Sequence, residues 1–355
     1  MTTVTQTMRT SRELAALVDL SARIGSDALL TQGPGGNTSV KEGGLLWVKA
    51  SGTWLSQAKE RPIMVPVRLE PLLQAIGRSD PACESAMEFV PAELNPQGLR
   101  PSIETTLHAV LPHKVVLHVH CVETIAWSVL ADGEQQLQEL LWEIGGIYVP
   151  YARPGLPLAQ LIRNRATPET RIIVMANHGL VVAGDSVADA AARLEAAVTR
   201  LRRTARPAPG RNMPALLDLS SGSEYRPVAI AAAHACATDR DSLTVAQRGT
   251  LYPDHIVFLG AGVFALDEGE SLAHGLRRTT ADGSKPPPLI LVPGKGALIR
   301  KGLPPAAEAL AGCLGDVLAR LRPDNSIRPL TGAQVDAVAN WDAEKYRQSL
   351  ARRAD

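Results

Sequence analysis

The chain has 355 residues, 45% of them apolar, and its 37 lysines and arginines almost balance 36 aspartates and glutamates. This length exceeds the roughly 100 to 200 residues of one domain, so we expect two domains. A near-neutral chain gives no support to a polyanionic partner, and we expect no nucleic acid. No apolar run approaches the ~18 residues of a membrane span, and the N-terminus lacks a secretory pattern, so we expect no membrane association.

The four cysteines are scattered along the chain without a C-x-x-C pair: Cys83, Cys121, Cys236 and Cys313. This spacing favours neither a disulfide framework nor a cysteine zinc site. A reducing compartment fits the pattern best, and we expect a cytoplasmic protein.

The first 60 residues predict a helix and two loops rich in small polar residues. An amphipathic helix runs to about Ser26, and the segment LLTQGPGGNTSVK follows it with three glycines and Asn37. The strand LLWVKASGTWL then leads to a second loop at Ser51 and Gly52. Backbone N–H groups and hydroxyls of two such loops suit an oxyanion, although plain turns are the commoner use of this composition.

The next segment carries an acid at the start of a predicted helix. Residues 62–77 predict a strand and a short helix, and residues 78–100 predict an irregular connection. Ser102 is a natural N-cap, with Glu104 in the first turn, and Pro112 ends the helix. Glu104 in this position either interacts with the helix dipole alone or serves a site nearby.

Two histidines share one face of the strand KVVLHVHCV. Side chains of His118 and His120 point the same way and lie about 6 to 7 Å apart at the backbone, which suits one metal ion. His178, in the segment RIIVMANHGLVVAG that we expect to form a strand, is the candidate third ligand. Three nitrogens with an open fourth position are typical of catalytic zinc, whereas histidines of the ordinary apolar core are the alternative.

The rest of the chain predicts further helices and strands. Helices are expected at 125–130, 135–144, 158–165, 188–206, 227–237, 304–321 and near 332–350, and strands at HIVFLGAG and PLILVPG. The Pro- and Gly-rich segment RPAPGRNMPAL is the best domain boundary. We therefore expect a catalytic domain over 1–206, a linker over 207–224 and a small α/β domain over 225–355.

Gly260, Gly262 and Ala265 have the G-x-G-x-x-A spacing of dinucleotide sites. That fingerprint requires a helix opening at the glycines, and VFALDEGESL instead predicts a second strand and a turn. We therefore interpret this segment as a tight hairpin.

Residues from about Glu13 to Arg206 resemble the class II aldolase/adducin family, typified by fuculose-phosphate and rhamnulose-phosphate aldolases. The resemblance rests on GGNTS, on SG of KASGTW, on SIE of PSIETT, on HVH of LHVHCV, on PYA of VPYARPG and on NHG of MANHGL. These motifs occur in the family's order with similar spacing. The resemblance implies an α/β/α fold with a central, mainly antiparallel sheet, to which this chain adds a smaller C-terminal α/β domain.

The resemblance also implies a metal site. His118, His120 and His178 match the zinc ligands of the family, with Mn²⁺ or Co²⁺ as alternative ions. Glu104 matches the acid that closes the metal shell at rest and transfers a proton when substrate binds. Proton transfer near neutral pH requires a raised pKa, which a low-dielectric pocket would supply.

Further positions match the substrate site of the family. Asn37, Ser51, Gly52 and Ser102 match residues around the substrate phosphate. Tyr151 matches a tyrosine that reaches a neighbouring subunit's site and gives a proton to the aldehyde oxygen, which implies a homotetramer.

The function implied is a metal-dependent aldolase that cleaves a ketose 1-phosphate into dihydroxyacetone phosphate and a short aldehyde. A 4-epimerase, a dehydratase or a decarboxylase on the same site, and an adducin-like interaction protein without turnover, are the alternatives. Ile103 stands where fuculose-type enzymes carry a second phosphate-binding serine, so a substrate without phosphate also stays open.

Overall fold

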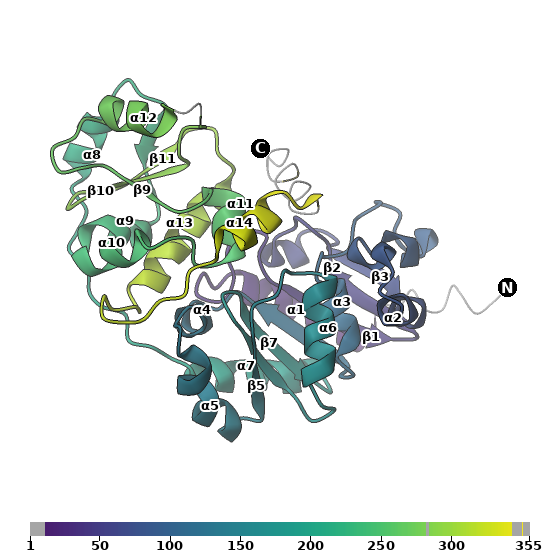
Figure 1. Cartoon of the computed structure of the whole chain (residues 1–355). Helices are drawn as coiled ribbons and strands as arrows, with labels where there is room; N and C mark the ends of the chain where they lie inside the picture. Colours follow the sequence, from purple (N-terminus) through teal and green to yellow (C-terminus); the bar gives the residue numbers. More distant parts are fainter. Residues whose placement is uncertain (1–10, 282–283, 343–349, 351–355) are drawn as a thin grey trace. The chain divides into compact units, whose positions relative to one another are not determined.

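The computed structural model describes residues 11–281, 284–342 and 350 of the chain and divides into two compact units. Unit 1 contains Met1–Cys121 and Gln136–Leu201, and unit 2 contains Val122–Gln135 and Arg202–Asp355 (Figure 1). The bounds expected from the sequence place residues 122–135 in the first domain, whereas the structure groups them with unit 2. The chain therefore leaves unit 1 directly after the H-x-H motif and returns to it.

The centre of unit 1 is a seven-stranded sheet. Its strands are β1 (Asn37–Glu42), β2 (Leu45–Lys49), β3 (Met64–Arg68), β4 (Val115–Val119), β5 (Gly146–Val149), β6 (Ile172–Met175) and β7 (Gly179–Gly184). Their order is β3-β2-β1-β4-β7-β6-β5, and every pair is antiparallel except β5 and β6. The expected α/β fold with a mainly antiparallel central sheet is confirmed.

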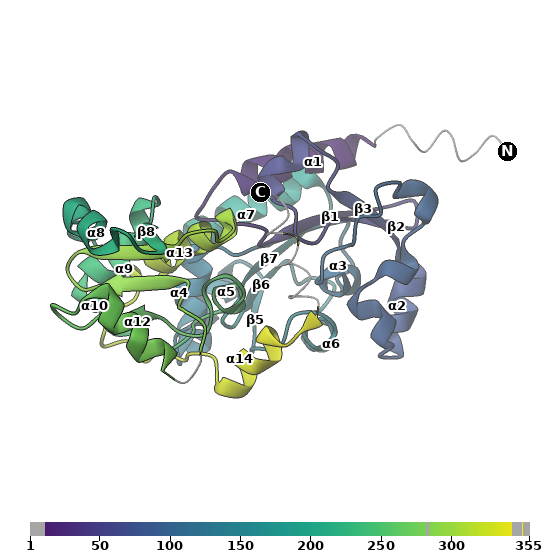
Figure 2. The same ribbon diagram turned by 90° about the horizontal axis from the view of Figure 1, so that it is seen from above.

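Helices cover both faces of this sheet, as Figure 2 shows. On one face lie α1 (Arg12–Gly25) and α7 (Val187–Arg200), and on the other lie α2 (Leu69–Gly77), α3 (Thr105–Val110) and α6 (Leu156–Arg165). Ser11 caps α1 and Ser186 caps α7, each by accepting a hydrogen bond from a backbone N–H in the first turn. The expected irregular connection over 78–100 contains three short 3₁₀ helices, η2 (Pro81–Glu84), η3 (Met87–Phe89) and η4 (Ala92–Leu94), and a fourth, η1 (Leu55–Lys59), follows β2.

The segment expected as one strand over 171–184 is a hairpin. β6 ends at Met175 and β7 begins at Gly179, so His178 lies in the turn between them. Asn177 adopts a left-handed conformation with φ 53°, which asparagine tolerates better than most residues. The continuous apolar pattern concealed the turn because both strands are fully buried.

Unit 2 is built on a smaller, four-stranded sheet. Its strands are β8 (Tyr225–Pro227), β9 (Phe264–Ala265), β10 (Leu289–Val292) and β11 (Gly296–Arg300), in the order β8-β11-β10-β9. Its helices are α4 (Val122–Ser128), α8 (Met213–Ser220), α9 (Ala231–Thr238), α10 (Arg240–Ala246), α11 (Pro253–Leu259), α12 (Leu272–Thr280), α13 (Pro305–Leu318) and α14 (Gly332–Ala339), while α5 (Gly133–Glu143) spans the return to unit 1.

Several features of unit 2 differ from the sequence-based expectation. The expected linker over 207–224 contains α8, which Asn212 caps through its side chain. The strands β8 and β11 and the helices α10 and α12 were not expected. The expected last helix begins as α14 at Gly332, and its residues 343–349 lie outside the described part of the chain.

The segment HIVFLGAG, expected as a strand, forms helix α11 instead. Pro253 occupies the first turn, and Gly260, with φ 81°, ends the helix. Thr250 accepts a hydrogen bond from the Gly262 N–H at 2.7 Å, and His255 Nε2 lies 2.9 Å from the Gly262 carbonyl. The glycines thus follow a helix and form a fixed turn, which is not the geometry of a dinucleotide fingerprint.

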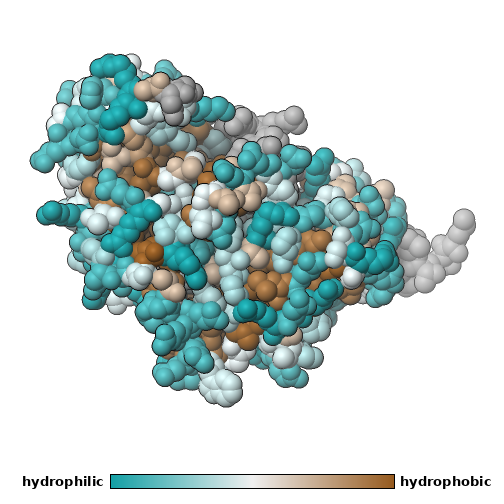
Figure 3. All heavy atoms as spheres, viewed as in Figure 1, coloured by the Kyte–Doolittle hydropathy of each residue, from teal (hydrophilic) through white to brown (hydrophobic). Residues whose placement is uncertain are grey.

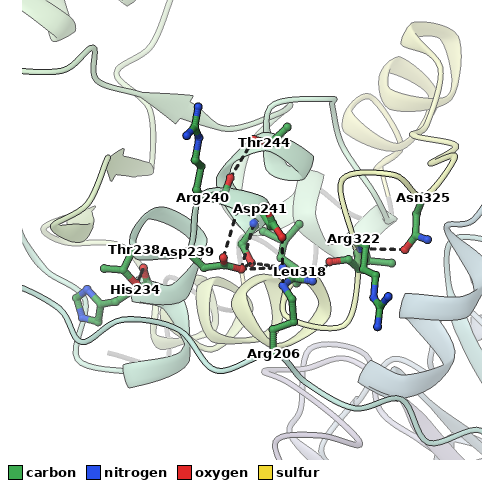
Figure 4. A network of polar contacts seen from close by, with 12 residues as sticks. Arg206, His234, Thr238, Asp239, Arg240, Asp241, Thr244, Leu318, Arg322 and Asn325 are labelled. Carbon is green, nitrogen blue, oxygen red and sulfur yellow. Dashed lines mark hydrogen bonds and ion pairs between the residues drawn. The ribbon is translucent and has the colours of Figure 1, made fainter.

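A polar network fixes the chain at the start of unit 2 (Figure 4). The Arg206 guanidinium pairs with Asp239 at 2.7 Å and donates to the Leu318 carbonyl at 3.2 Å. Asp239 also caps α10 by accepting from the Ser242 N–H. Arg206 therefore places a positive charge at the C-terminus of α13, where the helix dipole favours it.

The face of the molecule in Figure 3 is mostly hydrophilic, with apolar side chains in separate patches. Among the described residues, no helix is long and apolar enough to cross a membrane.

Candidate metal centre

Four predicted residues converge in unit 1. Glu104, His118, His120 and His178 are all buried, and each offers one ligand atom within 4.8 Å of the others. We call them the His₃Glu group. Glu104 lies at the N-cap of α3, the first two histidines come from β4 and the residue after its end, and His178 comes from the β6–β7 turn.

The ring nitrogens of the group face one another. Nε2 of His118 lies 3.3 Å from one carboxylate oxygen of Glu104, and Nε2 of His178 lies 3.2 Å from the other. Nε2 of His120 lies 3.1 Å from Nε2 of His118. Three imidazole nitrogens and a carboxylate oxygen around one point are a donor set that suits Zn²⁺ and related divalent ions.

A hydrogen bond fixes the tautomer of His118. Its Nδ1–H donates to the Leu180 carbonyl on β7 at 3.1 Å, so the neutral ring carries its lone pair on Nε2. This lone pair points toward the other members of the His₃Glu group, and backbone partners of this kind are common for histidines that bind metal. The residues present therefore fit a bound divalent ion.

The backbone brings His178 close to the other histidines. A Cβ atom on Gly179 would lie 2.4 Å from the Val119 carbonyl and 3.3 Å from the His120 Cα. Only glycine allows β7 to approach β4 this closely at its first residue. The glycine of the NHG motif therefore has a packing role beside the ligand.

Two opposing effects act on the pKa of Glu104. Burial raises it, but the positive charges that His118 and His178 carry when they are protonated lower it more, and the result lies well below the ordinary value of a glutamate. The direction is opposite to the expected rise toward neutrality. The neighbouring imidazoles determine the direction of the pKa shift, and they favour the ionised carboxylate of Glu104.

Asn37 contacts the acid directly. Its Nδ2 donates to Glu104 Oε2 at 2.9 Å, and its Oδ1 contacts Nε2 of His108. Asn37 was expected beside a substrate phosphate, and the structure places its amide between Glu104 and His108. The only signal for His108 in the sequence was a weak one, namely its position one turn after Glu104.

Ser51, Gly52 and Ser102 lie in two adjoining segments. The Ser51 N–H donates to the Arg100 carbonyl at 2.8 Å, and the Ser102 N–H donates to the Lys49 carbonyl at 2.9 Å. The Ser102 hydroxyl accepts from the Glu104 N–H at 3.2 Å. The Ser51 hydroxyl is buried and has no hydrogen-bond partner among the described residues. Gly52 has φ 75°, a conformation that favours glycine.

Lys49 joins the two small-residue loops. Its buried ammonium donates to the Pro34 carbonyl at 2.8 Å and to the Thr53 carbonyl at 2.6 Å. The first carbonyl belongs to the GPGGN loop and the second to the SGT loop. In the sequence, the position of Lys49 in an otherwise apolar strand is the feature that could have indicated a buried, hydrogen-bonded lysine.

Tyr151 lies in the loop after β5. Burial raises the pKa of its hydroxyl to about 12, although Arg153 opposes the rise. Among the described residues the hydroxyl has no hydrogen-bond partner, and neither Tyr151 nor Ser51 bonds to the His₃Glu group. Arg153 fixes the loop through an ion pair with Glu84 at 3.0 Å.

A seven-stranded α/β unit with a buried His₃Glu group defines a protein of the metal-binding α/β class. The family model for the Class II Aldolase and Adducin N-terminal domain matches residues 15–204, more than half of the chain. The chain therefore belongs to this family, and the resemblance seen in its motifs is confirmed. Membership of this family supports an enzymatic role, of the lyase type or a related type, that uses a divalent metal ion.

Three known proteins illustrate the similarity. Uncharacterized oxidoreductase YuxG of Bacillus subtilis (strain 168) is 33% identical over 182 residues, which are 48% of this chain and 26% of that protein. The chain thus spans about a quarter of that relative's length. The N-terminal class II aldolase domain of a conserved protein from Thermoplasma acidophilum is 31% identical, with a TM-score of 0.47, 54% of this chain and 92% of that chain covered. L-fuculose-1-phosphate aldolase from Thermus thermophilus is 21% identical, with a TM-score of 0.34, 53% of this chain and 90% of that chain covered.

Proposed function

We propose that this chain is a metal-dependent aldolase of carbohydrate metabolism that reversibly cleaves a ketose 1-phosphate to dihydroxyacetone phosphate and a short aldehyde. The observation that carries the proposal is the buried convergence of Glu104 with three imidazole nitrogens in a member of the class II aldolase family. Zn²⁺ is the proposed ion, with Mn²⁺ or Co²⁺ as alternatives, and His118, His120, His178 and Glu104 would hold it.

Glu104 is the proposed proton carrier. A bound divalent ion would supply a Lewis acid for the negative charge that develops on the ketose oxygens during cleavage. In synthesis the ionised Glu104 carboxylate would remove a proton from the nucleophilic carbon of the three-carbon compound, and in cleavage a protonated Glu104 would return that proton to the carbanion carbon. Its carboxylate is buried, its lowered pKa favours the ionised form that accepts a proton, and one of its oxygens is held by Asn37.

The two small-residue loops are the proposed site for the substrate's anionic group. The Ser51 hydroxyl is buried and has no partner in the part of the chain that the structure describes, and the buried charge of Lys49 lies under both loops. Gly52 and Ser102 supply backbone and hydroxyl groups beside them. Ile103 contributes no donor where fuculose-type enzymes have a serine, so phosphate binding here relies on these remaining groups.

Tyr151 is the proposed acid for the aldehyde oxygen, acting in the site of a neighbouring subunit of a homotetramer. Its raised pKa keeps the hydroxyl protonated at neutral pH, as a proton donor requires. We further propose a cytoplasmic location. Tyr151→Phe should slow turnover and leave the metal content unchanged, and sedimentation of a monomer would contradict the tetramer.

Metal analysis of the purified protein tests the site. His118→Ala and His178→Ala should lose most of the bound metal, whereas His274→Ala should keep it because that side chain is exposed in unit 2. Metal content equal to that of the parent in both site variants would show that the group is not the metal site.

A screen over ketose 1-phosphates tests the reaction, with dihydroxyacetone phosphate as the detected product. Formation of this product supports the aldolase. An epimer, a dehydrated product or carbon dioxide would replace the aldolase by one of the other reactions named above. No turnover by metal-loaded protein on any of these substrates would favour an adducin-like binding role.

A further inference from the structure

A chain of hydrogen bonds runs from Glu104 into the core of unit 1. Glu104 Oε2 accepts from Asn37 Nδ2 at 2.9 Å, Asn37 Oδ1 contacts His108 Nε2, and His108 Nδ1 lies 2.7 Å from the Ser39 hydroxyl. All four residues are buried, and two of them, Asn37 and Ser39, come from strand β1. His108 and Ser39 have no part in the function proposed above.

The chemistry of the groups fixes the direction of every bond in this chain. An ionised carboxylate only accepts, so the amide nitrogen of Asn37 faces Glu104 and its oxygen faces His108. That oxygen also only accepts, so Nε2 of His108 carries the hydrogen. The Ser39 hydroxyl lies 2.7 Å from Nδ1 and donates to it when the ring is neutral, because a hydroxyl can act as donor. The other tautomer would place two acceptors against each other in the core.

We propose that His108 is a positioning residue for proton transfer, because its Nε2–H orients the Asn37 amide, which in turn holds one carboxylate oxygen of Glu104. The proposal rests on the proposed function, in which Glu104 carries the proton. It gives Asn37 a role in orienting the acid. Without the His108 donor, the Asn37 amide is free to rotate and present its oxygen to the carboxylate, which would displace Glu104 by repulsion.

Two substitutions separate positioning from simple packing. In His108→Gln the side-chain amide reaches about as far as Nε2 and keeps a donor for Asn37. In His108→Asn the amide reaches only about as far as Nδ1, so it keeps a partner for Ser39 and loses the donor for Asn37. Both variants place a neutral amide in the same buried position, and each is the other's control.

We expect a larger loss of turnover in His108→Asn than in His108→Gln. His108→Asn should lower kcat by about 30-fold or more with KM within about twofold of the parent, because the lost interaction serves the transition state. His108→Gln should stay within about threefold of the parent. Bound metal per chain should be equal in all three proteins. Equal losses in both variants, or a loss in neither, would overturn the proposal.

A second measurement reads the geometry without turnover. Histidine-selective ¹⁵N NMR of the full chain, with the His108 signals assigned by their absence from His108→Asn, should show the neutral Nε2–H tautomer at neutral pH. A neutral Nδ1–H tautomer, which has no hydrogen on Nε2, would overturn the proposal. If the parent proves to have no aldolase activity, the proposed function fails, and the tautomer still decides the orientation of the hydrogen-bond chain.

Discussion

At the scale of single residues, Glu104 shows what the sequence could predict and what it could not. The H-x-H spacing predicted that His118 and His120 share one face of a strand, and His178 was a candidate third ligand. The place of Glu104 in the group was implied by the family resemblance, because an isolated glutamate at a helix start is explained by the helix dipole alone. The sign of the pKa shift of Glu104 was beyond the sequence. It depends on the distances of 3.2 and 3.3 Å to two imidazole nitrogens, which only the fold defines.

The hydroxyl of Ser51 makes a prediction possible at the same scale. It is buried, and within residues 11–281 and 284–342 it has no hydrogen-bond partner, so its removal breaks no hydrogen bond seen there. Ser51→Ala should leave the free energy of unfolding within about 0.5 kcal/mol of the parent and raise KM for the phosphorylated substrate about tenfold. Urea unfolding and steady-state kinetics measure the two quantities.

Ser39→Ala is the matched control for Ser51→Ala. The Ser39 hydroxyl bonds to His108 at 2.7 Å, so its loss should cost about 1 kcal/mol or more of stability. An equal loss of stability in both variants would show that Ser51 has a structural partner in solution.

At the scale of elements, short apolar segments limited the prediction. The strands around His118 and Trp47 were predicted because their neighbours include turns and polar residues at regular intervals. Each of the segments 171–184 and 255–262 was predicted as one strand, whereas the first is a hairpin and the second is mainly a helix. A buried hairpin, a buried strand and a buried helix can share one apolar composition, so the pattern does not distinguish them. Local backbone choices at Asn177 and Pro253 decided these cases.

The close approach of β7 to β4 gives a prediction for Gly179. A methyl group there would meet the Val119 carbonyl at 2.4 Å, so Gly179→Ala should move the β6–β7 turn and His178 away from the other histidines. We expect metal affinity to fall about tenfold or more, measured by competition with a chelator. Gly77→Ala, where no atom lies within 4 Å of the added group, should bind metal as the parent does.

The turn after α11 gives a prediction for pH dependence. Burial lowers the pKa of His255 to about 4, although the Gly262 carbonyl opposes the effect. Below the ordinary pKa of ~6.5 the unfolded chain binds a proton that the folded chain does not, so stability falls as pH decreases from about 6.5 to about 4. Above pH ~6.5 the ring is neutral in both the folded and the unfolded chain, so this loss of stability is absent there.

His255→Gln removes that titration and keeps an N–H donor. Urea unfolding between pH 4 and 8 should show the stability of the parent relative to this variant falling by about 1.4 kcal/mol per pH unit within that window. A constant difference across the whole range would mean that the ring takes up its proton in the folded state.

At the scale of the whole molecule, helix α4 belongs to unit 2 through buried polar contacts. Glu123 pairs with Arg320 at 2.9 Å and accepts from the Arg203 N–H at 2.8 Å. The Arg203 guanidinium lies 4.1 Å from the centre of the Trp127 ring. The sequence alone does not reveal these contacts, because the paired residues lie far apart in the chain and neither segment carries a distinctive motif.

The Glu123–Arg320 pair makes a prediction about the stability of unit 2. Both side chains are buried, so Arg320→Met leaves a carboxylate without its partner cation and should cost about 3 to 5 kcal/mol. Glu123→Gln combined with Arg320→Met should recover part of that loss. Urea unfolding measures both, and Arg322→Met, an exposed position, is the control. A cost for Arg320→Met no larger than that of the control would contradict the pairing.

Residues 122–135 belong to unit 2 but lie between the two segments of unit 1, and this sets the order in which the two units can fold during synthesis. Residues 122–135 leave the ribosome long before Arg203 and Arg320, so the partners that bury α4 are not yet synthesised. Residues 136–201 complete unit 1 in the meantime. All four members of the His₃Glu group are by then part of the nascent chain. Unit 1, with the His₃Glu group, can therefore be complete on the ribosome before unit 2 closes around α4.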